Sequence, residues 1–74
     1  MLIYEPQYKT LGQNIAFYRR RKELTQERLA EMVDINNVHM NRIERGVASA
    51  SLDTLFAIAA ALEVEPYKLF QEKE

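Results

Sequence analysis

Two short helical patterns separated by only three residues constrain the fold of this chain more than any other feature. Thr25 is a good N-cap for the first pattern, and Gly46 suits the position just after the second, where left-handed backbone is common. The Asp-Ile-Asn sequence at residues 34–36 interrupts the apolar spacing. Asp tolerates the left-handed conformation of a tight turn, and Asn36 can cap the helix that follows. Residues 25–46 are therefore predicted to form two helices joined by a sharp turn.

The spacing within residues 26–45 separates buried from exposed side chains. Ala30 supplies the small residue that two crossing helices need at their contact. The positions expected to be buried are Leu29, Val33, Ile35, Met40 and Ile43. The side chains left facing outward are rich in amides and cations and lack acid: Asn36, Asn37, Val38, His39, Asn41 and Arg42.

The rest of the chain also has helical spacing. Leu11, Ile15 and Tyr18 recur at i, i+4 and i+7, which predicts an amphipathic helix ending near residues 22–23. Pro66 can start a short last helix. With only two Gly and two Pro, the chain is expected to be all-α with short connections. Ser51 and Asp53 open a fourth helix, whose apolar residues are Leu52, Leu55, Phe56, Ile58, Ala59 and Leu62.

Composition narrows the class of protein. The 74 residues include no Cys, so stability has to come from helix packing, helped by oligomerisation, without disulfides or a cysteine-rich metal site. The N-terminus lacks the pattern of a secretion signal, and a cytoplasmic location is expected. The net charge of −1 hides a polarity. Residues 1–46 carry eight basic and six acidic side chains (+2), and residues 47–74 carry two basic and five acidic ones (−3).

Residues 11 to about 70 resemble the phage repressor/Cro family of helix-turn-helix regulators. The resemblance rests on the runs TQERLAEMVDINNVHMNRIERG and SLDTLFAIAAALEV, with the motifs T-Q-x-x-L-A, I-E-R-G, and S-L-x-T-L followed by A-L-x-V. It implies a compact five-helix bundle that binds duplex DNA as a dimer, with the third helix in the major groove. The chain then divides into an N-terminal extension (1–10), a helix-turn-helix DNA-binding domain (11–70) and a C-terminal tail (71–74).

The resemblance implies roles for individual residues. Gln26 matches a glutamine that touches the DNA backbone, and Arg19 and Glu44 match a pair that ties the first helix to the third. Asp34 stands where the family usually has Gly, and we expect the turn to persist with modest strain because Asp is second choice for positive φ. The family's variable base-reading positions match Asn37, Val38, His39, Asn41 and Arg42. The charge of Arg45 adds a phosphate contact, and Asn36 is either a helix cap or a further DNA contact.

Several of these residues have two interpretations. Arg42 suits guanine N7 and O6, and either Asn37 or Asn41 suits adenine. Val38 either packs on a thymine methyl group or is an accident of composition. His39 is either a DNA contact or an idle surface residue, and with no cysteine near it a metal site has almost no support.

Both ends of the domain leave alternatives open. The basic run at residues 19–22 is either a solvated helix end, which the helix dipole favours, or a set of phosphate contacts. Tyr67, Leu69 and Phe70 either close the core or form a dimer interface. The apolar residues of the N-terminal extension are expected to pack on the domain or on a partner subunit: Leu2, Ile3, Tyr4 and Tyr8.

The sequence therefore predicts a transcriptional regulator and not an enzyme. A homodimer would bind a palindromic operator and act as a repressor or a controller protein. We expect no cofactor, metal or small-molecule ligand, because the sequence has no metal cluster, no nucleophile beside a base and no Gly-rich phosphate loop. The alternative is an antitoxin or adaptor module that mainly holds a protein partner, for which only residues 1–10 and 71–74 are spare.

Overall fold

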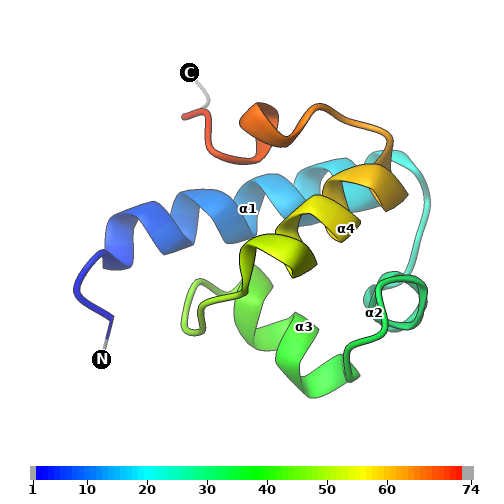
Figure 1. The fold of residues 1–74 in the computed structure, drawn as a ribbon, viewed down its shortest axis with the longest axis horizontal. Helices are drawn as coiled ribbons and strands as arrows, with labels where there is room; N and C mark the ends of the chain where they lie inside the picture. The colour runs from blue at the N-terminus through cyan, green and yellow to red at the C-terminus, as the bar shows by residue number, and fades with distance from the viewer. Residues whose placement is uncertain (1, 73–74) are drawn as a thin grey trace.

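The computed structural model describes residues 2–72, and this range contains four α-helices and one turn of 3₁₀ helix (Figure 1). In chain order the elements are α1 (Glu5–Arg21), α2 (Gln26–Met32), α3 (Asn37–Glu44), α4 (Leu52–Leu62) and the 3₁₀ turn η1 (Pro66–Leu69). The longest helix, α1, contacts each of the other elements. α2 and α3 lie together on one side of α1, and η1 returns along the other side (Figure 1). The all-α prediction is confirmed for this part of the chain.

Capping side chains begin the three helices that follow α1, as predicted. In each case a side-chain oxygen accepts a hydrogen bond from the backbone N–H three residues later. The distance is 3.0 Å at Thr25, 2.7 Å at Asn36 and 3.1 Å at Ser51. A cap of this kind contributes about 1 kcal/mol to stability, so local sequence fixes where each helix begins.

Left-handed backbone shapes the connections on either side of α3. Asp34 adopts φ 60° in the turn between α2 and α3, so the turn persists with Asp in place of Gly, as expected. Gly46 follows α3 with φ 76°. A Cβ at Gly46 would also lie 2.7 Å from the Cα of Lys9 in α1. The conformation of this position therefore disfavours a side chain, and its packing against α1 excludes one.

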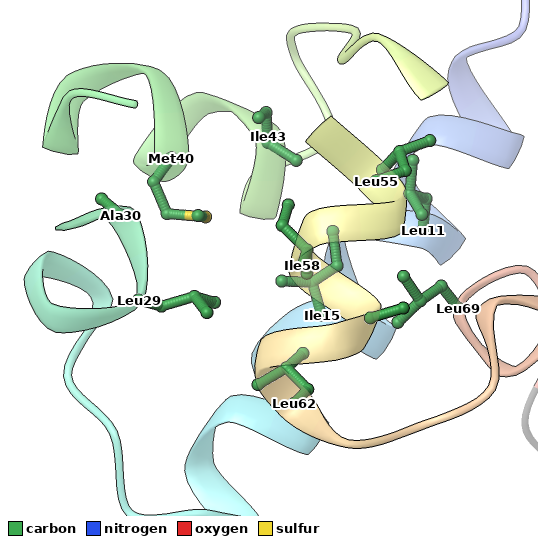
Figure 2. Packing of buried hydrophobic residues seen from close by; sticks show 11 residues of the cluster. Leu11, Ile15, Leu29, Ala30, Met40, Ile43, Leu55, Ile58, Leu62 and Leu69 are labelled. Atoms are coloured by element: carbon green, nitrogen blue, oxygen red, sulfur yellow. The ribbon is translucent and has the colours of Figure 1, made fainter. Parts of the chain in front are cut away.

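The core lies where α1, α2, α3 and α4 meet (Figure 2). Ile15, Leu29, Met40 and Ile58 are completely or almost completely inaccessible to solvent. Val33, Ile35 and Tyr18 are half-buried against this cluster. The remaining buried apolar residues are Leu11, Ala16, Ala30, Ile43, Leu55, Ala59, Leu62 and Leu69. The predicted buried faces of the first three helices are confirmed.

α4 presents a wider apolar stripe than the core covers. Leu52 is 64% exposed and Phe56 is 53% exposed, although the helical spacing placed both with the buried residues of this helix. α4 turns Leu55, Ile58 and Leu62 inward. At about 100° per residue, Leu52 and Phe56 lie beyond the edge of that inward face.

The predicted fifth helix is a single 3₁₀ turn, so the described residues contain four α-helices and not five. The buried side chain of Asn14 ties the end of this turn to α1. Its Nδ2 group donates to the carbonyl oxygens of Leu69, at 2.9 Å, and Gln71, at 2.7 Å.

Leu69 belongs to the core and cannot form part of a dimer interface in this fold, because it is 0% exposed. This corrects one of the three residues for which the sequence left both interpretations open. Its neighbours Tyr67 and Phe70 are 57% and 53% exposed. The alternation follows from the single 3₁₀ turn, which points Leu69 toward α1 and α4 and leaves its neighbours facing outward.

The N-terminal residues contribute to α1, which begins at Glu5 with Pro6 in its first turn. Tyr8 packs against the core of its own domain, which was one of the two predictions for the N-terminal extension. Ile3 and Tyr4 are exposed, and Leu2 is half-buried. Residues 5–10 are thus continuous with the first helix of the domain.

α1 and α3 approach so closely at Gly12 that no side chain fits between them. A Cβ built at Gly12 would lie 2.4 Å from the carbonyl oxygens of both Ile43 and Glu44. Both oxygens belong to the backbone, so they cannot move aside without moving the end of α3. Gly12 therefore fixes the distance between α1 and the C-terminal end of α3.

Gly12→Ala is expected to lower the free energy of unfolding by about 1–3 kcal/mol, the usual cost of overpacking a core contact. In an ordinary helix interior the same change stabilises by roughly 0.5–1 kcal/mol, so the sign of the effect reports the close approach. Urea denaturation followed by circular dichroism measures it, with Gln13→Ala at the adjacent exposed position as the control. A Gly12→Ala variant as stable as the wild type would contradict the proposed crossing.

Candidate nucleic-acid interface

α3 has one face in the core and the opposite face in solvent. Met40 and Ile43 are buried, whereas Val38 is 70% exposed and Arg42 is also exposed. At about 100° per residue, Val38, Arg42 and Arg45 fall within about 60° of one another around the helix axis. We call these three residues the outer face of α3. It carries two cations and one apolar side chain.

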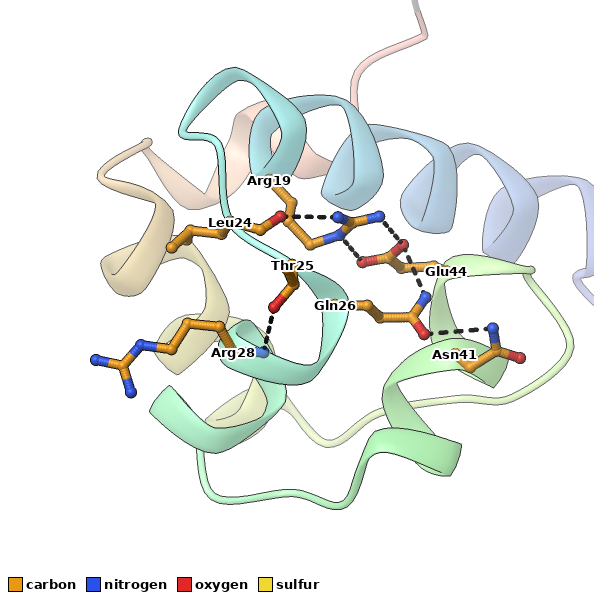
Figure 3. A network of polar contacts seen from close by, with 7 residues as sticks. All are labelled: Arg19, Leu24, Thr25, Gln26, Arg28, Asn41 and Glu44. Atoms are coloured by element: carbon orange, nitrogen blue, oxygen red, sulfur yellow. Dashed lines mark hydrogen bonds and ion pairs between the residues drawn. The ribbon is translucent and has the colours of Figure 1, made fainter.

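An ion pair whose side chains are largely covered joins the end of α3 to α1 (Figure 3). Arg19 Nε donates to Glu44 Oε2 at 2.7 Å, and Arg19 Nη2 donates to Glu44 Oε1 at 3.1 Å. The two side chains are only 12% and 6% exposed. Arg19 Nη1 also donates to the Leu24 carbonyl at 2.9 Å, so the same guanidinium holds the connection between α1 and α2. This two-bond geometry fixes the orientation of α3 as well as its distance from α1.

Gln26, the first residue of α2, extends this network toward α3. Its Nε2 donates to Glu44 Oε1 at 3.1 Å, and its Oε1 accepts from Asn41 Nδ2 at 3.3 Å (Figure 3). Gln26 and Asn41 are half-buried. The sequence pattern placed Asn41 on the exposed face and did not anticipate its contact with Gln26. The predicted helix-turn-helix order nevertheless contains a signal for this contact. Residue 26 begins α2, residue 41 follows the first turn of α3, and the sharp turn brings these two helices together.

The basic run at the end of α1 divides into separate environments. Arg19 is committed to Glu44, so it is structural. Arg21 lies over the ring of Phe17, 5.6 Å from its centroid, and Lys22 forms an ion pair with Glu63. Arg20 is exposed. Of residues 19–22, the structure therefore assigns a structural contact with α3 to Arg19, and phosphate contact stays a prediction for Arg20, Arg21 and Lys22.

The two helices, their sharp turn and the outward face of the second helix are the geometry of a helix-turn-helix unit. A model of the helix-turn-helix family matches residues 15–69, which is most of the chain. The chain belongs to the helix-turn-helix family.

Known helix-turn-helix regulators resemble this chain closely enough to confirm the resemblance to phage repressors. It is 39% identical over 56 residues to the immunity repressor protein of Bacillus phage phi105, covering 76% of this chain but only 39% of that repressor. It is 34% identical over 59 residues to the control protein C.SmaI of Serratia marcescens, covering 80% of this chain and 70% of that protein. The crystal structure of the restriction-modification controller protein C.AhdI from Aeromonas hydrophila superposes with a TM-score of 0.83 at 32% identity, covering 88% of this chain and 98% of that one.

The helix-turn-helix unit arranges the predicted DNA-contact residues unequally. Asn36, Asn37, Val38, Arg42 and Arg45 are exposed. The oxygen of the Asn36 side chain accepts the capping bond from the His39 N–H, and its NH₂ group is the donor that this residue offers to DNA. His39 and Asn41 are half-buried on opposite flanks of α3.

Metal-ligand groupings and membrane-spanning helices are two further features that a chain of this composition could hold. Among residues 2–72, no three His, Cys, Asp or Glu side chains are grouped so that they could hold a metal ion. Within the same range, no helix has the length and apolar character needed to cross a membrane.

Arg19→Ala is expected to lower the free energy of unfolding by about 3–5 kcal/mol, because it leaves the 6% exposed Glu44 carboxylate without a cation and with only the Gln26 amide as donor. Arg20→Ala, one residue away and exposed, is the matched control and should change stability by less than about 0.5 kcal/mol. Urea denaturation compares the two variants. Equal stabilities would show that the ion pair does not hold α3 in place.

Proposed function

We propose that this protein is a transcriptional regulator that binds a specific sequence of duplex DNA with α3 in the major groove. The exposed outer face of α3 carries the proposal, because its side chains are free of the core while the helix itself is held by the Arg19–Glu44 pair. A helix about 10–12 Å across fits a groove about 12 Å wide. The family match and the repressor and controller relatives support the same function.

The residue chemistry gives each position on α3 a role. Arg42 donates to guanine N7 and O6, Asn37 pairs with adenine, and Val38 packs on a thymine methyl group. Gln26, Arg45 and the NH₂ group of Asn36 contact phosphates. His39 is half-buried on the opposite flank of α3 from Asn41, and no base or phosphate contact is assigned to it.

We also propose that the protein binds a palindromic operator as a homodimer. The two bidentate contacts, from Arg42 and Asn37, supply about 1–3 kcal/mol each, so at most about 6 kcal/mol of discrimination. To outcompete about 10⁶–10⁹ other genomic sites, the free energy of binding to the operator must be more favourable than that of non-specific binding by about 8–12 kcal/mol. One subunit therefore falls short, whereas two subunits with α3 helices about 34–36 Å apart supply enough.

The surface proposed for dimerisation is formed by the exposed aromatic residues Tyr67 and Phe70 together with Leu52 and Phe56 of α4. Phe70 and Leu52 also line a groove of about 310 Å³ with Tyr4 and Tyr8. Apolar side chains gathered around a groove are typical of the centre of a subunit interface. η1 does not contact α2 or α3, so this surface leaves the outer face of α3 free for DNA.

Selection of binding sites from random duplex DNA tests the proposed function. The wild type is expected to enrich a palindromic motif. Arg42→Ala should relax the preference at one base pair of each half-site, whereas Arg45→Ala should weaken binding to all sequences and make the salt slope shallower by about one. Failure of the folded wild type to enrich any motif would contradict the proposed function.

Phe70→Glu is expected to raise the dimer dissociation constant at least about tenfold, because it places a charge in an apolar interface. Val47→Glu changes an exposed apolar residue outside the proposed surface and is the matched control. Sedimentation equilibrium over a range of concentrations measures both. A wild type that stays monomeric, alone and on its operator, would contradict the dimer and leave the surface to a different protein, as an antitoxin or adaptor would require.

A further inference from the structure

Asn41 occupies a position that neither the core nor the outer face of α3 explains. It is half-buried, and at about 100° per residue it lies about 60° from Val38 around the helix axis. This places it at the border of the outer face, on the flank next to Gln26. Its Nδ2 group lies 3.3 Å from Gln26 Oε1, and Gln26 Nε2 lies 3.1 Å from Glu44 Oε1.

The Glu44 carboxylate determines how the side-chain amides of Gln26 and Asn41 are oriented. Glu44 faces Arg19, and an ionised carboxylate can only accept hydrogen bonds. Gln26 must therefore turn its NH₂ group toward Glu44, which leaves its oxygen facing Asn41. Asn41 must in turn direct its own NH₂ group at that oxygen. The orientation of both side-chain amides follows from the buried ion pair.

The free edge of the Asn41 amide therefore presents a fixed pattern of hydrogen-bonding groups. One N–H is spent on Gln26, so the side chain retains one N–H donor and the acceptor Oδ1. Adenine offers the complementary pair in the major groove, an acceptor at N7 and a donor at N6. Guanine offers two acceptors, N7 and O6, and an amide that is held in this way cannot turn its whole NH₂ group toward them.

We propose that Asn41 is a specificity-determining residue that selects adenine over guanine at one base pair of each half-site, and that Gln26 is the positioning residue that holds its amide in the selective orientation. This inference rests on the proposed function, and it assigns to Asn41 an adenine contact additional to that of Asn37. It also gives the Gln26 carboxamide a role in sequence reading besides its proposed phosphate contact.

Site selection with three variants tests the inference. Asn41→Ala is expected to abolish the adenine preference at one base pair, a loss of about five- to 150-fold in discrimination for one bidentate contact. Gln26→Met keeps the length of the side chain without its hydrogen bonds, so it should reduce the preference at that same base pair. Asn37→Ala is the matched control on the same helix and should affect a different base pair.

The outcomes separate this inference from the proposed function. If the wild type enriches no motif, the proposed function fails. If the wild type enriches a motif and Gln26→Met weakens binding evenly, with every base preference intact, then only the positioning role is overturned. An Asn41→Ala variant with unchanged preferences would overturn the reading role.

A second measurement does not depend on DNA. In the ¹⁵N-labelled free protein, Gln26→Met is expected to shift the side-chain NH₂ resonances of Asn41 and leave those of Asn37 unchanged. An unaltered Asn41 signal in a folded Gln26→Met variant would overturn the positioning contact. Circular dichroism confirms that each variant is folded before its base preferences are compared.

Discussion

The arrangement of this domain depends on the hydrogen bonds that the Glu44 carboxylate accepts. This carboxylate sits at the end of α3, receives two hydrogen bonds from Arg19 of α1 and one from Gln26 of α2, and is 6% exposed. An acidic side chain this deeply buried is costly unless it is paired. The pair therefore restricts α1, α2 and α3 to the one arrangement that satisfies it. Gly12 adds the distance, since it lets α1 lie directly against the last carbonyls of α3.

This constraint links the stability of the domain to its proposed function. The outer face of α3 can read base edges only if the helix is held rigidly while its side chains stay in solvent. The core fixes one face through Met40 and Ile43, and Glu44 fixes the rotation of the helix about its axis. For the proposed DNA binding, the net charge of −1 matters less than which side chains the outer face of α3 carries. The residues that the proposal places on DNA include two cations, Arg42 and Arg45, and no acid.

The sequence predicted the features that depend on neighbouring residues. Caps at Thr25 and Asn36 and the left-handed backbone at Asp34 and Gly46 follow from a few adjacent side chains, and the structure has all of them. The buried faces of the first three helices also follow from local spacing. The Arg19–Glu44 contact came from the family resemblance, because no local pattern brings together two residues 25 positions apart.

Features that depend on packing between distant segments could not be predicted in this way. Leu69 is buried while Phe70 is exposed because η1 packs on α1 and α4, and Asn14, 55 residues before Leu69, donates to the Leu69 carbonyl. Leu52 belongs to the apolar stripe of α4 but lies outside the part that the core covers. The role of Gly12 and the hydrogen bond from Asn41 to Gln26 likewise appear only when the helices are brought together.

An NMR titration of the ¹⁵N-labelled protein with its selected duplex tests the central claim most directly, because it locates the DNA on the folded domain. The predicted result is that the largest shifts fall on residues 36–45 and on Gln26, and that they saturate with the duplex. Largest shifts on α4 or η1, with α3 unchanged, would show that DNA binds elsewhere and would contradict the proposed interface.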